Sequence, residues 1–312
     1  MSNAFTILHF CFNIIYMNDF YTIVVRNSEK NDTIYTYLKR LGHSENYLKN
    51  LRKKQGYILL NESVVFINQR IKDNDIIKTH INPNQKTQIQ FCDIPLDIVY
   101  EDSDIILINK PPHLATMPSR SHYNNNLSGA IAKYMSDKDP NFVVRIVNRL
   151  DKDTSGLIIV AKNSIVCNYF NNHQDLIEKT YFAICEGILQ KNLVIEKNIL
   201  TQKNEYGFND NKRITTDLQC GKSAQTFVYI EKILTNSTLV SLKLKNGRTH
   251  QIRVHMSSIG HPLVGDSLYG KTTSLINRTA LVCKKISFVH PITNKKLGFE
   301  IDFPNDFKSL ME

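Results

Sequence analysis

The spacing of apolar residues predicts a small helical unit near the start of the chain. In the stretch TIYTYLKRLG the apolar side chains recur at the spacing of one helix face, and Gly42 is a residue type that often ends a helix. Ser44 is well suited to begin a second short helix. The runs YILLN, VVFIN and DIIKTHI that follow are rich in β-forming residues. We therefore expect residues 17–84 to form two helices and a small sheet.

The pattern then changes to that of a larger body with mixed helices and strands. The stretch NPNQKTQIQFCDIPLD sustains no period, so residues 85–97 are expected to be a linker. Beyond it, DIILIN, VVRIV, LIIVA, KTYFAICEG, SAQTFVYIEKI and STLVSLKLK predict strands, and SGAIAKYM, SIVCNYFNNHQDLI and THQIRVHMSSIG predict helices. The expected fold class is α+β, with a small αβ unit ahead of a larger domain over residues 98–312.

Composition points to an anionic partner without proving one. The chain has 39 Lys and Arg against 29 Asp and Glu, which gives a net charge of +10. Such an excess suits RNA or DNA better than a membrane surface. The alternative is a generic basic protein from an A/T-rich genome, whose codons favour Lys, Asn and Ile.

Cysteine usage indicates a reducing compartment. The six cysteines show no CxxC spacing, and most lie in or beside apolar runs: Cys11, Cys92, Cys167, Cys185, Cys220 and Cys283. We expect buried thiols in a cytoplasmic protein, with neither a disulfide framework nor a zinc site. The apolar start of the chain is too short to span a bilayer and lacks the features of a signal peptide. Residues 1–16 are expected to be an extension or an accessory strand, with no membrane association.

Residues 17–84 resemble the S4 RNA-binding domain. The matching positions lie in the second helix, around the next turn and in the last strand: Ser44, Leu48, Leu51, Gly56, Ile58, Asn61, Ile71, Lys72, Asp73, Asp75 and Ile77. Six basic side chains crowd this part of the chain and would neutralise RNA phosphates: Lys39, Arg40, Lys49, Arg52, Lys53 and Lys54. The alternative is a solvated helix face, which most runs of charge are.

The stretch NRLDKDTSG, residues 148–156, places several charges between two apolar runs. A plain turn would explain its last residues but not Arg149 and Asp151 on either side of an apolar leucine. A second interpretation is the DxDxT loop of haloacid-dehalogenase-like phosphatases, in which the first Asp attacks phosphorus. That loop requires a helix after it and further acids for Mg²⁺, whereas this chain continues at once into LIIVA.

The third interpretation is the catalytic loop of RluA-type pseudouridine synthases, usually HRLDxxTSG, which this stretch resembles. Four more segments match that family in the same order. They are Ile108-Asn109-Lys110-Pro111, then Lys179-Thr180-Tyr181-Phe182-Ala183, then Gly247-Arg248-Thr249-His250-Gln251-Ile252-Arg253-Val254-His255, then Gly260-His261-Pro262-Leu263-Val264-Gly265-Asp266-x-x-Tyr269-Gly270. An S4-like unit ahead of such a body is also an arrangement of this family.

The resemblance implies a catalytic domain with a mostly antiparallel sheet and gives roles to individual residues. Asp151 matches the essential carboxylate, and Arg253 matches the cation that keeps it ionised, which a carboxylate removed from water requires. Tyr181 matches the aromatic residue that stacks on the target base, and Arg149 matches the residue that fills the space left by the flipped nucleotide. Leu281 is a candidate for the apolar wall of the pocket, although a core leucine is an equally good interpretation. We also expect Arg248 to bind RNA.

The implied function is isomerisation of specific uridines to pseudouridine in RNA. The base is detached from the sugar, turned and rejoined through carbon, and this chemistry implies no cofactor and no metal. Large-subunit ribosomal RNA is the expected partner, tRNA the second candidate, and no obligatory protein partner is implied. An RNA-binding protein without catalysis is the alternative.

Two positions depart from the family pattern. The usual His of the catalytic loop is Asn148 here, which can form hydrogen bonds but cannot carry a charge. Family members often read Leu-His-Ala where this chain has Leu281-Val282-Cys283. Neither departure falls on Asp151, Arg253 or Tyr181, so both concern the local hydrogen bonding and the choice of RNA more than the reaction.

Overall fold

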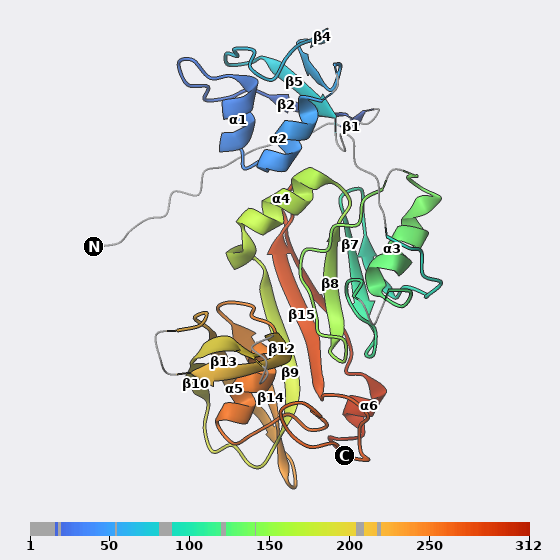
Figure 1. The fold of residues 1–312 in the computed structure, drawn as a ribbon, viewed down its shortest axis with the longest axis vertical. Helices are drawn as coiled ribbons and strands as arrows, with labels where there is room; N and C mark the ends of the chain where they lie inside the picture. Colours follow the sequence, from blue (N-terminus) through green and yellow to red (C-terminus); the bar gives the residue numbers. More distant parts are fainter. Residues whose placement is uncertain are drawn as a thin grey trace, which may run out of the picture.

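The computed structural model describes residues 16–17, 20–53, 55–80, 89–119, 123–140, 142–203, 209–216 and 220–312. Within these ranges the chain forms a small N-terminal unit and a larger unit built on one long sheet (Figure 1). The expected extension over residues 1–16 and the start of the expected linker lie almost wholly outside the described residues. None of the described helices is long and apolar enough to cross a membrane.

The N-terminal unit packs two helices against a sheet in the order β1-β2-β5-β3-β4. Thr33 and Ser44 cap the two helices, and the apolar faces expected from the sequence form one buried core. The expected strand VVFIN is shorter than predicted, since only its neighbourhood at Ser63–Val64 pairs. The elements are β1 (Tyr16–Met17), β2 (Phe20–Val24), α1 (Ile34–Arg40), α2 (Glu45–Leu51), β3 (Ile58–Leu60), β4 (Ser63–Val64) and β5 (Ile76–His80).

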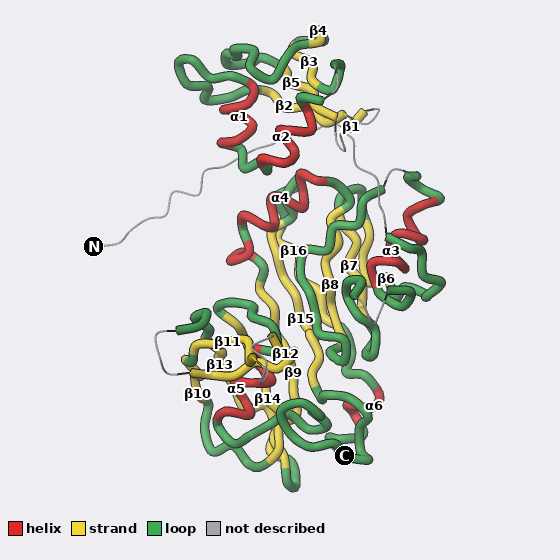
Figure 2. The backbone as a smooth tube through the Cα atoms, viewed as in Figure 1, coloured by secondary structure: helices red, strands yellow, loops and turns green. Residues whose placement is uncertain are grey.

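The larger unit is organised by a sheet in the order β10-β13-β14-β9-β15-β8-β7-β6, with β16 pairing β15 (Figure 2). Every pair is antiparallel except β8 with β15. The strands are β6 (Ile98–Glu101), β7 (Ile105–Lys110), β8 (Ser155–Ala161), β9 (Glu178–Glu186), β10 (Leu193–Glu196), β13 (Gln225–Ile233), β14 (Ser237–Leu244), β15 (Leu281–Val289) and β16 (Lys296–Glu300). The mostly antiparallel sheet expected from the resemblance is therefore confirmed.

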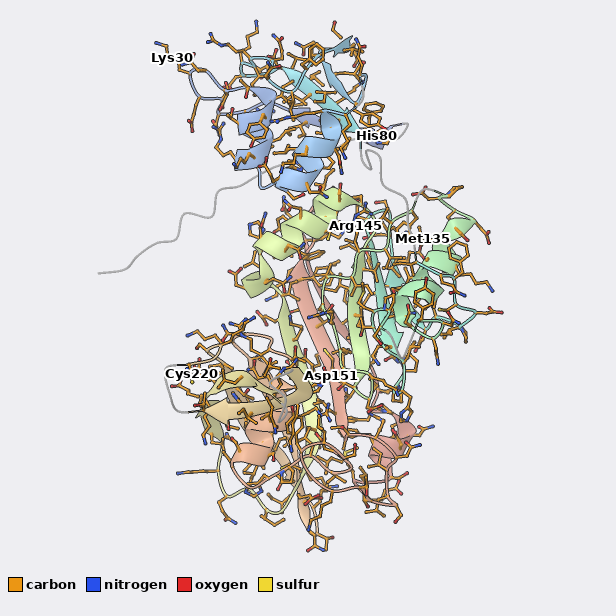
Figure 3. All side chains as sticks on the ribbon, viewed as in Figure 1. Lys30, His80, Met135, Arg145, Asp151 and Cys220 are labelled. Carbon is orange, nitrogen blue, oxygen red and sulfur yellow. The ribbon has the colours of Figure 1, made fainter. Side chains whose placement is uncertain are left out.

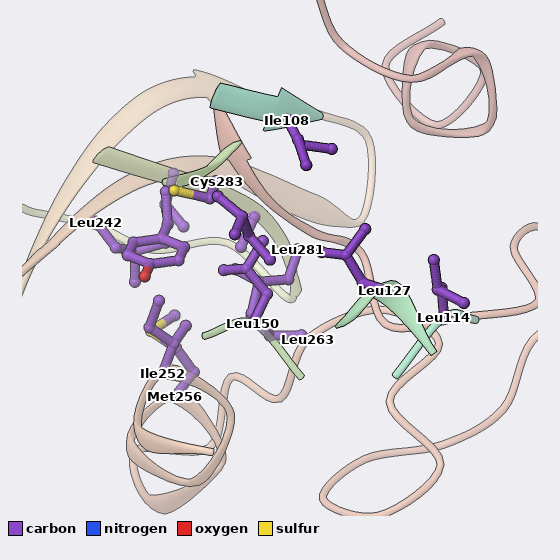
Figure 4. Close-up of a cluster of buried hydrophobic side chains, with 14 of the residues drawn as sticks. Ile108, Leu114, Leu127, Leu150, Leu242, Ile252, Met256, Leu263, Leu281 and Cys283 are labelled. Atoms are coloured by element: carbon purple, nitrogen blue, oxygen red, sulfur yellow. The ribbon is translucent and has the colours of Figure 1, made fainter. Parts of the chain in front are cut away.

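Helices and a separate hairpin cover this sheet. The helices are α3 (Leu127–Ser136), α4 (Ser164–Asn172), a short 3₁₀ helix (Gln174–Leu176), α5 (Gln251–Ser258) and α6 (Asn305–Lys308), and the hairpin is β11 (Asn198–Lys203) with β12 (Asn209–Thr216). Ile252 and Met256 of α5 pack into the same apolar cluster as Leu242, Leu281 and Cys283 (Figure 4). This packing fixes α5 against the face of the sheet on which the side chains of Leu242, Leu281 and Cys283 lie.

The two units touch at α4 (Figure 1). The Nδ2 atom of Asn172 donates a hydrogen bond to the carbonyl of Gly42 at 2.9 Å, and Ile165 packs against the N-terminal core. The described part of the expected linker packs on the larger unit. Cys92 is buried, and Ile94 and Leu96 pack against the core of that unit.

The prediction of a strand at VVRIV is wrong. This segment lies beside β8 and shares two backbone hydrogen bonds with it, from Val147 to Ile159 at 2.9 Å and from Ala161 to Arg145 at 2.8 Å, with one isolated bridge at Ile146. A strand does not continue because the next position, Asn148, uses its side chain in place of the backbone. Its Oδ1 accepts the N–H of Ile159 and its Nδ2 donates to Leu157.

Gly156 marks the place where the catalytic-loop candidate meets the sheet. Its φ is +116°, and a Cβ atom there would lie 2.3 Å from the carbonyl oxygen of Cys283. We expect Gly156→Ala to reduce the free energy of unfolding by at least about 2 kcal/mol, because backbone strain and a clash with β15 add together. Gly298→Ala is the control, since its nearest contact would be an ordinary 3.8 Å. Equal unfolding midpoints for the two variants in urea would contradict this account.

Candidate active site

Asp151 lies on a tight turn directly before β8 (Figure 3). Leu150 anchors the turn in the main apolar cluster, and the N–H of Thr154 donates to the carbonyl of Asp151 at 3.1 Å. The side chain of Asp151 is 27% exposed. Solvent therefore reaches the carboxylate, and the water-free setting expected from the sequence is not present in this structure.

The end of β7 and the segment after it hold the turn through hydrogen bonds to its backbone carbonyls. The hydroxyl of Thr116 donates to the carbonyl of Leu150 at 2.6 Å, and the Nζ atom of Lys110 donates to that of Lys152 at 3.0 Å. Asn148 ties the start of the turn to β8 by its two side-chain bonds. The residue that replaces the family's usual His is thus a structural clamp in this chain.

Lys110 is fully buried and has three oxygen acceptors. Besides Lys152, its Nζ atom donates to the carbonyls of Pro111 at 2.8 Å and Leu114 at 2.9 Å. Burial lowers the pKa of Lys110 to about 7, while the charges of Asp153 and Asp151 oppose that shift. Three acceptors match the three hydrogens of an ammonium group, so the cation both orders the turn and lies near its carboxylates.

Arg253 reaches Asp151, but its main partner is a different acid. Its Nε and Nη2 atoms each donate to Asp266 at 2.7 Å, whereas Nη1 lies 3.7 Å from Oδ2 of Asp151. Burial disfavours the charge of Arg253, but the hydrogen bonds and charge of Asp266 outweigh it and raise the pKa. The guanidinium is therefore held in one orientation with its third nitrogen directed toward Asp151.

Tyr181 lies in the apolar cluster that also contains Leu150 of the turn and Ile252 of α5. It is 8% exposed and pairs across the sheet with Leu242 and Cys283. Burial raises the pKa of Tyr181 well above its usual value, with contributions from Cys283 and from the charge of Asp151. Burial also raises the pKa of the Cys283 thiol to about 12, so this residue is an apolar neighbour of the ring. Leu281 is buried in the same cluster, as the sequence predicted for either a wall or a core position.

The remaining predicted residues divide by what they contact. Arg149 is exposed and forms no ion pair with a described residue. Arg248 donates from Nε to the carbonyl of Ser223 at 3.2 Å. In the N-terminal unit Arg40 pairs with Asp32 at 2.6 Å and Arg52 lies over Tyr35. Lys39 is exposed but lies 3.8 Å from Glu45, and Lys49 and Lys53 are exposed. Lys54 lies outside the described residues.

Several residues of this site were quoted within motifs without a role, and one was missed altogether. Lys110, His250 and Asp266 belong to matching segments, but their partners are distant in sequence. Thr116 gave no signal, because its contact is with a backbone carbonyl. His250 lies 3.9 Å from Oδ2 of Asp151.

A group of possible metal ligands occurs elsewhere in the described part of the chain. Asp102, Asp104 and His290 offer atoms within 4.8 Å of one another. These atoms already have protein partners: Asp102 accepts from His290, Tyr100 and two backbone N–H groups, and Asp104 accepts from Asn163 and Ser103. The group therefore joins the ends of strands and gives no reason to propose a metal centre.

A groove of about 360 Å³ beside β9 is not part of the site either. Thr180, Lys285 and Phe299 are among the residues that line it. Because successive residues of a strand face opposite sides of the sheet, Thr180 points away from the side that Tyr181 faces.

The phosphatase interpretation fails on the same geometry. The turn is followed by β8 and not by a helix, and the second acid of the motif, Asp153, contacts His113 at 3.2 Å. The carboxylate of Asp151, the guanidinium of Arg253 and the ring of Tyr181 instead come from three separate segments.

Comparisons with known proteins identify the same family that the sequence motifs resemble. The family model for RNA pseudouridylate synthase matches residues 104–258. A Bacillus subtilis protein described as an uncharacterized RNA pseudouridine synthase, YjbO, is 32% identical over 90% of this chain and 98% of its own length. Ribosomal large subunit pseudouridine synthase D of Zymomonas mobilis is 34% identical over 78% of this chain and 80% of its own length. The chain therefore belongs to the RNA pseudouridine synthase family and is an isomerase that acts on RNA.

Solved structures support the fold. Human RNA Pseudouridylate Synthase Domain Containing 4 has a TM-score of 0.55 at 19% identity, over 68% of this chain and 90% of its own. Human RNA Pseudouridylate Synthase Domain Containing 1 has a TM-score of 0.53 at 24% identity, over 67% and 84%.

We expect Lys110→Met to destabilise the protein by about 3 kcal/mol or more at pH 9, because the carbonyls that Nζ contacts, the buried one of Leu114 among them, lose their donor. The pKa of Lys110 falls on folding, so the unfolded chain binds the extra proton between about pH 7 and 10 and wild-type stability rises with pH there. The Met variant lacks this contribution, which is at most about 1.4 kcal/mol per pH unit. Urea unfolding at pH 7 and pH 9 measures both effects, with the exposed Lys152→Met as control. Equal stabilities of the two variants at pH 9 would show that the carbonyl contacts of Lys110 are unimportant.

Proposed function

We propose that the enzyme isomerises specific uridines of large-subunit ribosomal RNA, with tRNA as the second candidate. The relatives named ribosomal large subunit pseudouridine synthase D, from Zymomonas mobilis and Haemophilus influenzae, support this substrate. The net charge of +10 suits a polyanion. Ribosomal RNA is modified where ribosomes are made, so we infer a cytoplasmic enzyme.

One observation carries the proposed site: Asp151, Arg253 and Tyr181 converge from three segments far apart in sequence. Nη1 of Arg253 lies 3.7 Å from Asp151, and the charge of Asp151 contributes to the raised pKa of Tyr181. We assign Asp151 as the catalytic carboxylate and Arg253 as the cation that keeps it ionised. Addition to the sugar, addition to the base and removal of a sugar proton all use a carboxylate oriented in advance, and this arrangement serves each of them.

The other residues bind and orient the nucleotide in this proposal. Tyr181 stacks on the uracil, which is worth about 1–3 kcal/mol for one base. Leu281, in the same cluster, forms part of the apolar wall. Arg149, exposed beside the carboxylate, fills the space left in the RNA when the nucleotide swings out. The proposed reaction uses no cofactor, metal or obligatory protein partner.

The N-terminal unit is proposed as an S4-like RNA-binding domain over residues 17–84. The side chains of Lys39, Lys49 and Lys53 are exposed on or just after its two helices, while Arg40 is used within the unit. Arg248 of the larger unit is proposed to add a contact to the same RNA.

The proposed substrate and the role of Asp151 are tested together by mapping pseudouridine in total RNA. Cells that lack the protein should lose pseudouridine at one or a few sites in large-subunit ribosomal RNA. Wild-type protein should restore these sites, whereas Asp151→Asn, present at the same level, should not, because an amide cannot act as the carboxylate. Loss of sites only in tRNA would move the substrate to tRNA, and restoration by Asp151→Asn would refute the assigned role.

The RNA-binding role of the N-terminal unit predicts a salt effect. Changing Lys49 and Lys53 together to Gln should weaken binding and reduce the slope of log affinity against log salt by about 0.7–0.9 for each phosphate that is no longer neutralised. The maximal reaction rate should stay the same. Arg40→Gln is the control, because Arg40 is paired with Asp32 and its loss should affect stability more than the salt slope. An unchanged slope in a binding titration of the double variant would place the RNA contacts elsewhere.

A further inference from the structure

His250 has an unusual backbone conformation beside the proposed carboxylate. Its φ of +57° is in the left-handed region, where residues other than glycine are uncommon, and it directly precedes α5. Its side chain does not cap the helix. The ring instead lies with Nε2 3.9 Å from Oδ2 of Asp151 and is only 16% exposed.

The other ring nitrogen of His250 faces a hydroxyl group whose hydrogen is available. Nδ1 lies 3.0 Å from the hydroxyl oxygen of Tyr269, and that oxygen already accepts the backbone N–H of Arg213 at 2.7 Å. The hydroxyl hydrogen is satisfied if it is donated to Nδ1, which leaves the imidazole proton on Nε2. Burial lowers the pKa of His250, although Asp151 opposes that shift, and this favours the neutral ring.

The closest contacts of His250 and Arg253 with Asp151 are both made to the same carboxylate oxygen. Nε2 of His250 and Nη1 of Arg253 both lie near Oδ2, at 3.9 and 3.7 Å, while Oδ1 has no hydrogen bond to any residue in the described ranges. Both distances exceed an ordinary hydrogen bond, and contacts of this kind often tighten only when a substrate is bound.

We propose that His250 is a positioning residue for Asp151. In the RNA complex its Nε2 donates to Oδ2, so that Oδ1 faces the nucleotide. Tyr269 holds the His250 ring in the tautomer that has its proton on Nε2. The inference rests on the proposed role of Asp151. Tyr269 is itself placed by two contacts, its N–H to Asp266 at 3.1 Å and its carbonyl to the hydroxyl of Ser257 at 2.8 Å. Its ring also lies under the guanidinium of Arg253, with 5.2 Å from Cζ to the ring centroid.

The test compares reaction rate with RNA affinity. The probe is total RNA purified from cells that lack the protein, reacted with excess enzyme at increasing enzyme concentrations while pseudouridine is followed at the mapped sites. His250→Ala should lower the maximal rate by about 10²-fold, the cost of a misplaced reacting group, with the half-saturating concentration little changed. His250→Gln, whose amide N–H replaces Nε2–H, should recover most of the rate. His173→Ala is the control. His173 is exposed and distant from His250 in the sequence, so this variant should react as the wild type does.

Tyr269→Phe keeps the ring under Arg253 and removes only the hydroxyl group. It should slow the reaction in the same direction, and adding it to His250→Ala should cause no further loss, since Tyr269 acts through His250. A wild-type maximal rate for His250→Ala, or equal rates for the Ala and Gln variants, would overturn the proposal, and so would additive losses in the double variant. If His250→Ala does not fold, the rates of His250→Gln and Tyr269→Phe decide the outcome: wild-type activity of Tyr269→Phe, or a Gln variant as slow as Asp151→Asn, would overturn it.

The Asp151→Asn variant separates the two levels of the proposal. If it reacts at the wild-type rate, the role of Asp151 itself fails. If it is inactive while His250→Ala reacts normally, only the role of His250 fails.

Discussion

The site depends on one buried carboxylate, that of Asp266. Its side chain is fully buried and accepts four hydrogen bonds, two from Arg253 and one each from the N–H groups of Leu268 and Tyr269. Removing one partner of such a buried pair leaves an uncompensated charge, which typically costs about 3–5 kcal/mol. Asp266 therefore fixes both the guanidinium that approaches Asp151 and the tyrosine that approaches His250, although it does not contact Asp151 itself.

A second, separate set of contacts fixes the turn that carries Asp151. Thr116 and Lys110 bind its carbonyls, and Asn148 binds the adjoining strand. These contacts do not involve the carboxylate of Asp151, so the proposed catalytic group has no short hydrogen bond in the described residues while its backbone is held. The backbone of the turn is therefore positioned before RNA binds, which is one requirement of a preorganised site.

Much of the architecture was predictable because it follows from local patterns. The helices α1 to α5 and about half of the described strands formed where the sequence pattern placed them, and five ordered motifs identified the family. Other strands, among them the central strand β15, were not predicted. Two further failures have a common cause. VVRIV is not a strand because Asn148 substitutes a side chain for a backbone partner, and the principal partner of Arg253 is Asp266 because a folded loop brings them together. A contact with a backbone carbonyl, such as that of Thr116, cannot be predicted from sequence, because every residue type carries the same carbonyl group.

The position of β15 in the sheet has a consequence for how the enzyme is made. The turn bearing Asp151 leads into β8 and Tyr181 lies on β9. In the described sheet β15 lies between these two strands and pairs with both of them. β15 begins at Leu281 of 312 residues. The proposed catalytic side chains therefore all precede, in the chain, the strand that joins β8 to β9, so the sheet that aligns them forms only once β15 has been synthesised.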